Sequence, residues 1–418
     1  MLAMRYFIPI WNRQKEIRML SAGIDTHLEK HEVEIQDEKC NRLWKGSITN
    51  DRAGMERLRS KLTEISHTSS QEFVGVYINS TGNYHRPLQN CLERCGYRVV
   101  PVNPIVSDAA RKIRNLGRVK NDRVDASVLA STPWTDAKFI DSPVHRRNPL
   151  SELTRLDRKL EESVTRLQNM IGSDLAAVFP EYHRIIGNMD SATSLAILDR
   201  YAVPENIANV TEQELTAFIH TASRGKLGHD LAVRLKAAAA DSIGISDSEH
   251  VFEFRMRMNV RRLRDEKERR NELRAEIERR IEGNATVQFI DGITGVSTVA
   301  AASIVSEIGD IKQFDTPDRL QSYGGGYPNV RESAGKKGMA VQCRAVNHYL
   351  RGTVGKCAKS TVASRNSEFA AVFKHAKDSG KSDTEAYAVV NKRLLRHVYS
   401  IMKNSLPYRE RMPRGSSS

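Results

Sequence analysis

The sequence predicts an α/β domain at the N-terminus and a mainly α-helical remainder. Short strand-like segments alternate with helical patterns up to about residue 147, whereas helical spacing of apolar residues dominates beyond it. The length of 418 residues leaves room for more than one domain, at roughly 100 to 200 residues each. We expect an α/β domain over 19–147, a helical coiled-coil region over 148–283 and a mainly α domain over 284–405.

Three strand-like segments in succession open the α/β domain. They cover Met19–Asp25, His31–Glu38 and Arg42–Ile48, and the second alternates polar residues with Val33 and Ile35. Three consecutive short strands predict a meander. Apolar residues at helical spacing follow and predict a helix: Met55, Leu58, Leu62 and Ile65.

A buried strand, a further helix and a last strand complete the domain. Phe73–Asn79 is a nearly continuous apolar run, which is typical of a central strand covered on both faces. A helix with one apolar side follows around Leu88 and Leu92, and Arg98–Val102 predicts the last strand. The order βββαβαβ and then a helix matches the ribonuclease H-like (RuvC-like) fold. Its acids lie at the end of the first strand, just after the fourth, and on the last helix.

Three aspartates stand where that fold carries acids. Asp25 ends the first strand, and the spacing of three between Asp122 and Asp125 puts both carboxylates on one helical face. Mg²⁺ and Mn²⁺ prefer such oxygen ligands, and a two-metal site assists phosphodiester cleavage. Taken singly, Asp25 also fits a strand-end turn and Asp122 a helix N-cap. The ordered set favours the metal site, and the preference for oxygen makes His27 and His31 turn and strand residues instead of ligands.

The charge balance indicates polyanionic partners. Lys and Arg number 65 against 51 Asp and Glu, which leaves a net charge of +14 and a pI near 9.6. A predicted helix over Phe254–Ile281 carries eleven basic residues against six acids between Arg255 and Arg280. Its basic side is either a solvated face of a coiled coil or a nucleic-acid-contacting face, and both interpretations can hold at once. Ahead of it, an apolar seam predicts another long helix: Leu153, Leu156, Leu160, Leu167 and Ile171.

Cysteine usage and hydropathy indicate a reducing compartment without membrane insertion. The five cysteines form no CxxC pair and no zinc-type cluster, so we expect no structural metal. No apolar run approaches the roughly 18 to 20 residues of a membrane helix, and the opening residues lack a signal-peptide cleavage site. A cytoplasmic, nucleoid-associated protein is expected. Residues 1–18 are interpreted as an extension ahead of Met19, and 406–418 as a loose tail.

Two glycine-containing segments mark the C-terminal third. Gly292 and Gly295 form a tight turn ahead of a small-residue helix, which predicts a helix-hairpin-helix. Backbone amides in such a turn suit a phosphate, although a closely packed helix pair also uses glycine. The stretch Ser322–Gly338 is glycine-rich and basic, and Ser333 is its prominent serine.

Together these pieces resemble a family, the DEDD transposases of the IS110 class of bacterial and archaeal insertion sequences, relatives of the Piv-type DNA invertases. Eight segments agree in order and separation over roughly residues 19–405. The N-terminal ones are GIDTHLEKH around Asp25, NSTGNYHRPL from Asn79, VVPVNP and KNDRVDASVLA. The later ones are LTRLDRKL, FPEY, FIDGITGVSTVAA, and SYGGGYP with the following ESAG.

The resemblance implies a recombinase with a RuvC-like domain, a coiled-coil middle and a C-terminal domain that supplies a nucleophilic serine, here Ser333. In the family a structured noncoding bridge RNA pairs with donor and target DNA. A homo-oligomer, dimer to tetramer, forms composite sites from the acids of one protomer and the serine of another. The serine forms a covalent phosphoserine, which conserves bond energy for rejoining. Mg²⁺ or Mn²⁺ held by Asp25, Asp122 and Asp125 would neutralise the phosphate.

This chain departs from the family pattern at three places. Asn79 replaces the glutamate of a Glu-(Ala/Ser)-Thr-Gly-Asn-Tyr motif, so the position offers a carbonyl but no charge. The family serine usually precedes glycine directly; counting forward selects Ser333, whereas counting back from Gly335 selects Ala334. Val346 stands where a glycine is usual. A diverged and impaired member is therefore one hypothesis.

Three functions remain open: an RNA-guided transposase, a catalytically inactive nucleic-acid-binding relative, and a RuvC-like junction nuclease without serine chemistry. All three use contacts to phosphates. Cations close to the acids or to the serine are expected to supply them, although Lys120 and Arg123 also fit ordinary surface charges. The residues predicted to contact nucleic acid are Lys120, Arg123, Gly292, Gly295, Lys336, Lys337, Arg344, Asn347 and Arg351.

Overall fold

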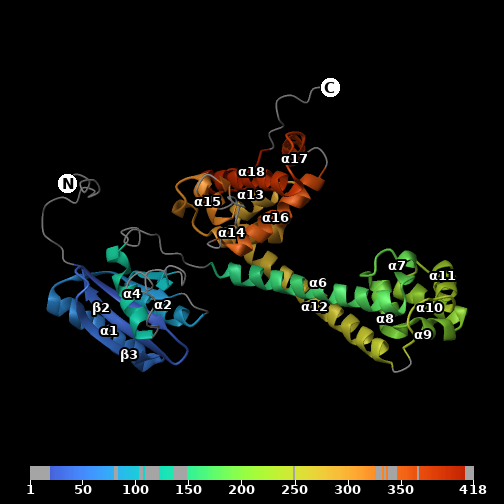
Figure 1. Cartoon of the computed structure of the whole chain (residues 1–418), viewed down its shortest axis with the longest axis horizontal. Helices are drawn as coiled ribbons and strands as arrows, with labels where there is room; N and C mark the ends of the chain where they lie inside the picture. The colour runs from blue at the N-terminus through green and yellow to red at the C-terminus, as the bar shows by residue number, and fades with distance from the viewer. Residues whose placement is uncertain are drawn as a thin grey trace. The chain divides into compact units, whose positions relative to one another are not determined.

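Two units make up the chain, residues 1–146 and residues 147–418 (Figure 1). The computed structural model describes residues 19–79, 83–102, 107–108, 122–135, 148–247, 250–325, 332–333, 336–337, 346–364 and 367–409. The first unit is a mixed α/β structure and the second is mostly helical, as the sequence predicts. The predicted division at 283/284 falls inside the second unit and stays a prediction.

A five-stranded sheet forms the first unit. Its elements are β1 (Met19–Thr26), β2 (Lys30–Asp37), β3 (Arg42–Thr49), α1 (Arg52–Ser69), β4 (Glu72–Asn79), α2 (His85–Arg94), β5 (Val99–Val102) and α4 (Asp122–Thr135). The strand order is β3-β2-β1-β4-β5. β1 pairs antiparallel with β2 and parallel with β4, so the C-terminal ends of β1 and β4 lie next to each other.

The two faces of this sheet differ in polarity because successive strand residues point to opposite sides. One face is apolar and packs under α1 and α2: Ala22, Ile24, Val33, Ile35, Leu58, Leu62 and Leu88 belong to one buried cluster. The other face carries polar residues at the alternate positions, among them Ser21 and Gln36, and α4 covers it.

A glycine brings α4 into direct contact with the polar face. A Cβ atom at Gly23 would lie 2.1 Å from the Ala126 oxygen and from the Ala130 nitrogen. Hydrogen bonds fix the contact: Ser21 Oγ donates to the Ala130 carbonyl at 2.5 Å, and Trp134 Nε1 donates to Ser21 Oγ at 3.0 Å. The backbone of α4 therefore lies directly on β1, two residues before Asp25.

Two long antiparallel helices organise the second unit, α6 (Leu150–Val178) and α12 (Val251–Ile281) (Figure 1). At one end lie α7 (Tyr182–Ile185), α8 (Ala192–Tyr201), α9 (Pro204–Asn209), α10 (Glu212–Ala222) and α11 (His229–Ala240). At the other lie α13 (Ala285–Asp291), α14 (Thr298–Ile308), η1 (Ile311–Gln313), α15 (Pro317–Tyr323), β6 (Glu332–Ser333), β7 (Lys336–Lys337), α16 (His348–Ala363), α17 (Glu368–Asp378) and α18 (Asp383–Asn404). Each end has its own apolar core.

The apolar seam predicted for α6 is wrong at Leu156, whereas Leu153 packs against the apolar core as expected. Leu167 and Ile171 are buried, but Leu156 is 44% exposed. Its place facing the protein is taken by polar side chains, including Thr154 and Asp157. The reason is the partner surface, because the first half of α6 packs against arginines of α12 and polar residues of α14. Among the described helices, none combines the length and apolarity needed to cross a membrane.

Candidate functional site

Asp25 and Asn79 meet where β1 and β4 end. The parallel register pairs Ile24 with Ile78, which places the next residue of each strand side by side. Asp25 is 2% exposed, and its Oδ1 accepts a hydrogen bond from Asn79 Nδ2. Asn79 Oδ1 accepts from the Thr26 backbone N–H at 2.9 Å and from the Thr26 hydroxyl at 2.7 Å. The amide thus connects the two strand ends.

Histidines contact this site more closely than the sequence indicates. His27 Nε2 lies 3.1 Å from Asp25 Oδ2, so each carboxylate oxygen of Asp25 has a nitrogen neighbour. His31 lies in β2, and its Nδ1 accepts a hydrogen bond from the His27 backbone N–H at 3.3 Å. Burial lowers the pKa of His31, and a hydrogen bond with the Asn50 side chain offsets this in part. His31 is therefore a neutral core residue at pH 7.

Two buried glutamates share the face of Asp25, and the sequence reasoning missed both. The β1–β2 register pairs Asp25 with Glu32 and Gly23 with Glu34, and the exposed fractions of the glutamates are 6% and 1%. Arg42 Nε lies 3.3 Å from Glu34 Oε2, whereas Lys30 Nζ lies 3.8 Å from Glu32 Oε1. The alternation of residues along the strand could have revealed them. Glu32 and Glu34 are alternate residues of β2, and their pairing with Asp25 and Gly23 puts both side chains on the same face of the sheet as Asp25.

The remaining predicted acids lie on α4. Asp122 is the first residue of the helix, and Asp125 directly precedes Ala126, whose carbonyl meets Gly23. Lys120 and the side chains of Asp122 and Arg123 lie outside the described residues. Within the described part of the chain, no three His, Cys, Asp or Glu side chains are close enough together to hold a metal ion.

Ser333 lies in a short antiparallel ladder of the second unit. The ladder pairs Ser333 with Lys336 and Glu332 with Lys337, so each backbone partner in β7 is a lysine. Ala334, Gly335 and Arg344 lie outside the described residues, as do the side chains of Ser333, Lys336 and Lys337. The acids and the serine belong to different units, and the assembly that joins them stays a prediction.

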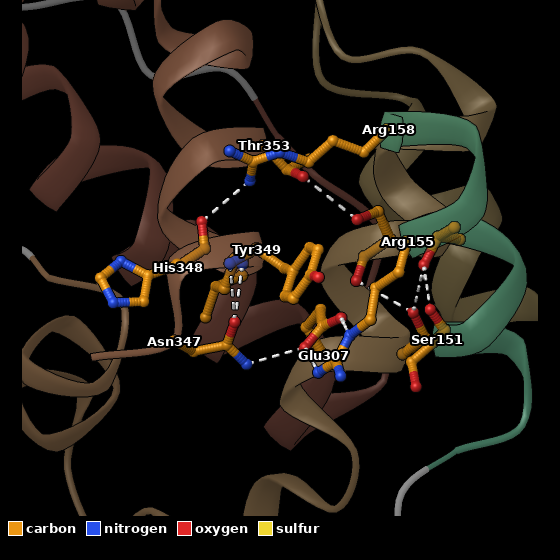
Figure 2. Close-up of polar contacts among 12 residues, drawn as sticks. Ser151, Arg155, Arg158, Glu307, Asn347, His348, Tyr349 and Thr353 are labelled. Atoms are coloured by element: carbon orange, nitrogen blue, oxygen red, sulfur yellow. Dashed lines mark hydrogen bonds and ion pairs between the residues drawn. The ribbon is translucent and has the colours of Figure 1, made fainter. Parts of the chain in front are cut away.

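Asn347 has an architectural role in the second unit (Figure 2). Its Oδ1 caps the N-terminus of α16 by accepting from the backbone N–H groups of Tyr349 and Leu350, at 3.0 Å each. Its Nδ2 donates to Glu307 Oε2 at 2.7 Å and to Tyr323 Oη at 2.8 Å. The contact to nucleic acid predicted for Asn347 would compete with these bonds.

A buried ion pair next to Asn347 attaches α6 to α14 (Figure 2). Arg155 donates from Nε and Nη2 to the two carboxylate oxygens of Glu307, at 2.6 and 2.7 Å. The guanidinium also lies 4.4 Å from the ring centroid of Tyr349. The hydrogen bonds with Glu307 are the main reason that the pKa of Arg155 is raised, so the guanidinium stays charged.

The predicted turn between α13 and α14 is present, and Gly295 has a packing reason. Its φ is +89°, and a Cβ atom there would lie 2.7 Å from the Thr361 backbone nitrogen of α16. The close-packing alternative therefore explains Gly295, while phosphate binding at Gly292 and Gly295 stays a prediction.

Arg351 is half-buried, and its Cδ would lie 2.9 Å from a Cβ atom at Gly325.

A groove of mixed charge lies beside Gly295, between α6, α12, α14 and α16. Its cations face acids within the groove: Arg270 and Arg274 donate to Asp157 Oδ1, at 3.0 and 2.9 Å, and Lys356 pairs with Glu161. Burial opposes ionisation of Asp157, but these arginine hydrogen bonds outweigh it and lower the pKa of Asp157. The groove is therefore a charged packing surface.

Most cations of the arginine-rich helix α12 are paired within the unit. Arg255 pairs with Asp174, and Arg261 and Arg264 pair with Asp199. Arg262 and Arg269 are exposed. The solvated-face interpretation thus fits much of α12, and the nucleic-acid face stays a prediction. The described cysteines, Cys40, Cys91, Cys95 and Cys357, are free.

Two transposase family models match the chain in separate regions. One, the DEDD transposase model of IS110, covers residues 22–180 and therefore includes Asp25, Asn79, Asp122 and Asp125. The other, described as "Transposase IS116/IS110/IS902 family", covers residues 287–374 and includes Ser333.

Curated relatives with transposon names are similar to most of the chain. "Mini-circle putative transposase for IS117" from Streptomyces coelicolor is 26% identical over 75% of this chain and 77% of its own length. "Insertion element IS110 uncharacterized 43.6 kDa protein", also from Streptomyces coelicolor, is 22% identical over 73% and 77%. "Insertion element IS116 uncharacterized 44.8 kDa protein" from Streptomyces clavuligerus is 22% identical over 79% and 81%.

Proposed function

This chain belongs to the IS110 family of transposases, and we propose that it cleaves and transfers DNA strands for an insertion sequence through serine chemistry guided by a bridge RNA. As a family member it is a DNA transposase. The observation that carries the proposal is the order of the two matched regions, one with the aspartates and one with Ser333. Both kinds of group are needed for metal-assisted transfer to a serine.

In the proposed reaction the Ser333 hydroxyl attacks a DNA phosphodiester. A bond forms between Oγ and phosphorus, the bond to one DNA oxygen breaks, and that oxygen takes up a proton. A second DNA hydroxyl then attacks the phosphoserine and releases the serine, so no external energy source is required. The basic residues close to Ser333 in the sequence, Lys336 and Lys337, support this proposal because a developing negative charge requires nearby cations.

The acidic face of the first unit, which is the sheet face that carries Asp25, Glu32 and Glu34, fits a divalent cation in part. Asp25 is a buried carboxylate, and hard cations such as Mg²⁺ or Mn²⁺ take such ligands. We propose that Asp25, Asp122 and Asp125 hold the cation, which when bound would neutralise charge at the scissile phosphate. Asn79 does not fit as a ligand, because its carbonyl oxygen accepts two hydrogen bonds from Thr26.

The finer features of the fold and its partners belong to the same proposal. The strand order β3-β2-β1-β4-β5, with β1 parallel to β4, supports a ribonuclease H-like (RuvC-like) fold. The antiparallel pair α6 and α12 supports a coiled coil, and α13 with α14 a helix-hairpin-helix. The net charge of +14 supports binding of donor DNA, target DNA and a bridge RNA. We propose a homo-oligomer, dimer to tetramer, in the cytoplasm at the nucleoid.

Trapping of the covalent intermediate tests the serine chemistry. The full chain is incubated with Mg²⁺, the element's DNA ends and its noncoding RNA, then denatured and examined for a protein–DNA adduct. We expect an adduct from the unaltered protein and from Ser322→Ala, an exposed serine of α15, and none from Ser333→Ala. An adduct that persists in Ser333→Ala identifies another nucleophile. Hydrolysis without any adduct favours the junction nuclease.

A second candidate function is nucleic-acid binding without cleavage. The observation that favours it is the engagement of Asn79 with Asp25, at the place where the resemblance expects a second acid. Restoring that acid distinguishes the candidates: Asn79→Glu is expected to raise strand transfer at least tenfold if only the acid is lacking. No gain, with RNA and DNA supplied, favours the binding protein.

A further inference from the structure

The orientation of the Asn79 amide is fixed by a backbone group. The Thr26 backbone N–H lies 2.9 Å from one terminal atom of Asn79, and a peptide N–H can only donate. That atom must therefore be the carbonyl oxygen, and the Thr26 hydroxyl donates to it as well, at 2.7 Å. The NH₂ group is consequently the end that faces Asp25.

The resulting arrangement reverses the polarity expected of a metal ligand. Asn79 presents N–H hydrogens, and therefore partial positive charge, to Asp25 Oδ1. A glutamate at position 79 would instead present a carboxylate, and two buried carboxylates in contact repel each other unless a cation or a shared proton lies between them. The amide supplies by hydrogen bonding the positive charge that a cation would otherwise supply.

The surroundings make this substitution significant. Glu32 lies opposite Asp25 in the ladder and Glu34 two residues further on, so three buried acids share one face of the sheet. Like charges placed opposite each other in a sheet repel. The amide of Asn79 and the imidazole of His27, which is 43% exposed, both contact Asp25 directly.

We propose that Asn79 is a latch that replaces a bound cation. Asn79, in β4, forms hydrogen bonds with both Asp25 and Thr26 of β1, so the ends of the two strands are held together without metal. A cation that binds Asp25 Oδ1 must first displace the amide. The inference rests on the proposed function in one respect, that a divalent cation is the natural ligand of these acids. It goes beyond that function by assigning Asn79 a role that a missing ligand does not have.

A metal titration of the full chain without nucleic acid tests the latch. Melting temperature and free Mn²⁺ (by its electron paramagnetic resonance signal) are measured for the unaltered protein, Asn79→Glu and Asn90→Glu. Asn90 is exposed on α2, so its variant adds the same charge away from the site. We expect Asn79→Glu to melt several degrees lower without metal, and to regain this with Mn²⁺. Its affinity for Mn²⁺ should be at least tenfold higher than that of the other two proteins.

Two results overturn the proposal. One is equal Mn²⁺ affinity of the unaltered protein and Asn79→Glu, since the amide would then not oppose metal. The other is an Asn79→Glu protein whose stability and Mn²⁺ signal do not respond to metal at all. If that variant folds only with Mn²⁺ present, refolding yield against Mn²⁺ concentration replaces the melting curve, and the dependence supports the latch.

A neutral variant separates the latch from the effect of added charge. Asn79→Ala removes the amide without adding a carboxylate, and we expect it to melt a few degrees below the unaltered protein in metal-free buffer. An unchanged melting temperature would show that the amide does not hold the strand ends. None of these measurements uses Ser333, so failure of the latch and failure of the serine chemistry are observed separately.

Discussion

Buried carboxylates have different surroundings in the two units. Among the described residues of 147–418, each buried carboxylate contacts at least one basic side chain: Asp157 with Arg270 and Arg274, Asp174 with Arg255, Glu307 with Arg155, and Glu368 with Arg393 and His397. In the described part of residues 1–146 three buried acids, Asp25, Glu32 and Glu34, share one face of the sheet, and the basic side chain that contacts each is itself substantially exposed: His27, Lys30 and Arg42, respectively.

The difference indicates which acids are architectural. A buried acid that pairs with an arginine holds two elements together. Removing either partner destabilises the fold, because it leaves a buried charge without its partner. Acids that gather on one face raise the energy of the empty protein, and they persist where a ligand or a reaction uses them. The acids of the helical unit therefore hold helices together, whereas the acids on the sheet face of the α/β unit are the candidates for a functional role. Four predictions test this contrast, beginning with the largest effect.

Removal of one partner from the Arg155–Glu307 pair should cost the most. Arg155→Ala leaves Glu307 buried and without its bidentate partner, and we expect a loss of about 3–5 kcal/mol in the free energy of unfolding. Urea denaturation followed by circular dichroism measures it. Arg166→Ala, at an exposed position of α6, serves as control and should stay within about 0.5 kcal/mol. A loss below 1 kcal/mol for Arg155→Ala would contradict the architectural role.

Low pH should weaken the contact between α6 and α12, because it protonates Asp157. Burial alone would raise the pKa of this carboxyl, but hydrogen bonds from Arg270 and Arg274 outweigh it, so the folded pKa lies below the usual 3.8. The stabilisation is therefore complete above the unfolded value and is lost as pH falls through the lower folded pKa. We expect Asp157→Asn to cost about 1.5–3 kcal/mol at pH 7. The gap to the unaltered protein should narrow below about pH 4, and a constant gap would refute the pairing.

The packing of α4 over the acidic face of the sheet should depend on Gly23. Gly23→Ala places a methyl group against the α4 backbone, and we expect about 1–3 kcal/mol of destabilisation together with a loss of strand transfer. Gly75→Ala is the matched control, because the atoms nearest to its Cβ would belong to the side chains of Arg98 and Tyr77, at 3.3 Å. Equal melting temperatures for the two variants would show that α4 can shift without cost.

Neutralising an acid of the first unit should cost least. We expect Glu32→Gln to change the free energy of unfolding by less than about 1 kcal/mol, because the loss of repulsion from Asp25 offsets the loss of the contact with the exposed Lys30. Asp174→Asn in the second unit should be clearly destabilising, since Arg255 loses its partner. Thermal melting of both variants decides the matter. Equal losses would end the distinction between the two units.

The sequence predicted the strands and most helices because their periodicities are local. The run Phe73–Asn79 and the strand ending at Asp25 lie where they were expected, as β4 and β1. The seam of α6 was wrong at Leu156, since a leucine at helical spacing does not reveal that the facing surface is polar. Glu32 and Glu34 were missed for a related reason, because alternate polar residues in a strand usually face water, and here α4 covers them.

By itself the sequence determined the order of elements, the excess positive charge and the departure at position 79, since each can be counted along the chain. It could not decide what Asn79 does. Only the tertiary structure brings the Thr26 backbone N–H to the Asn79 oxygen and so turns its amide toward Asp25. The physical reason is that a hydrogen bond depends on position and direction across 53 residues of chain, which composition and spacing do not contain.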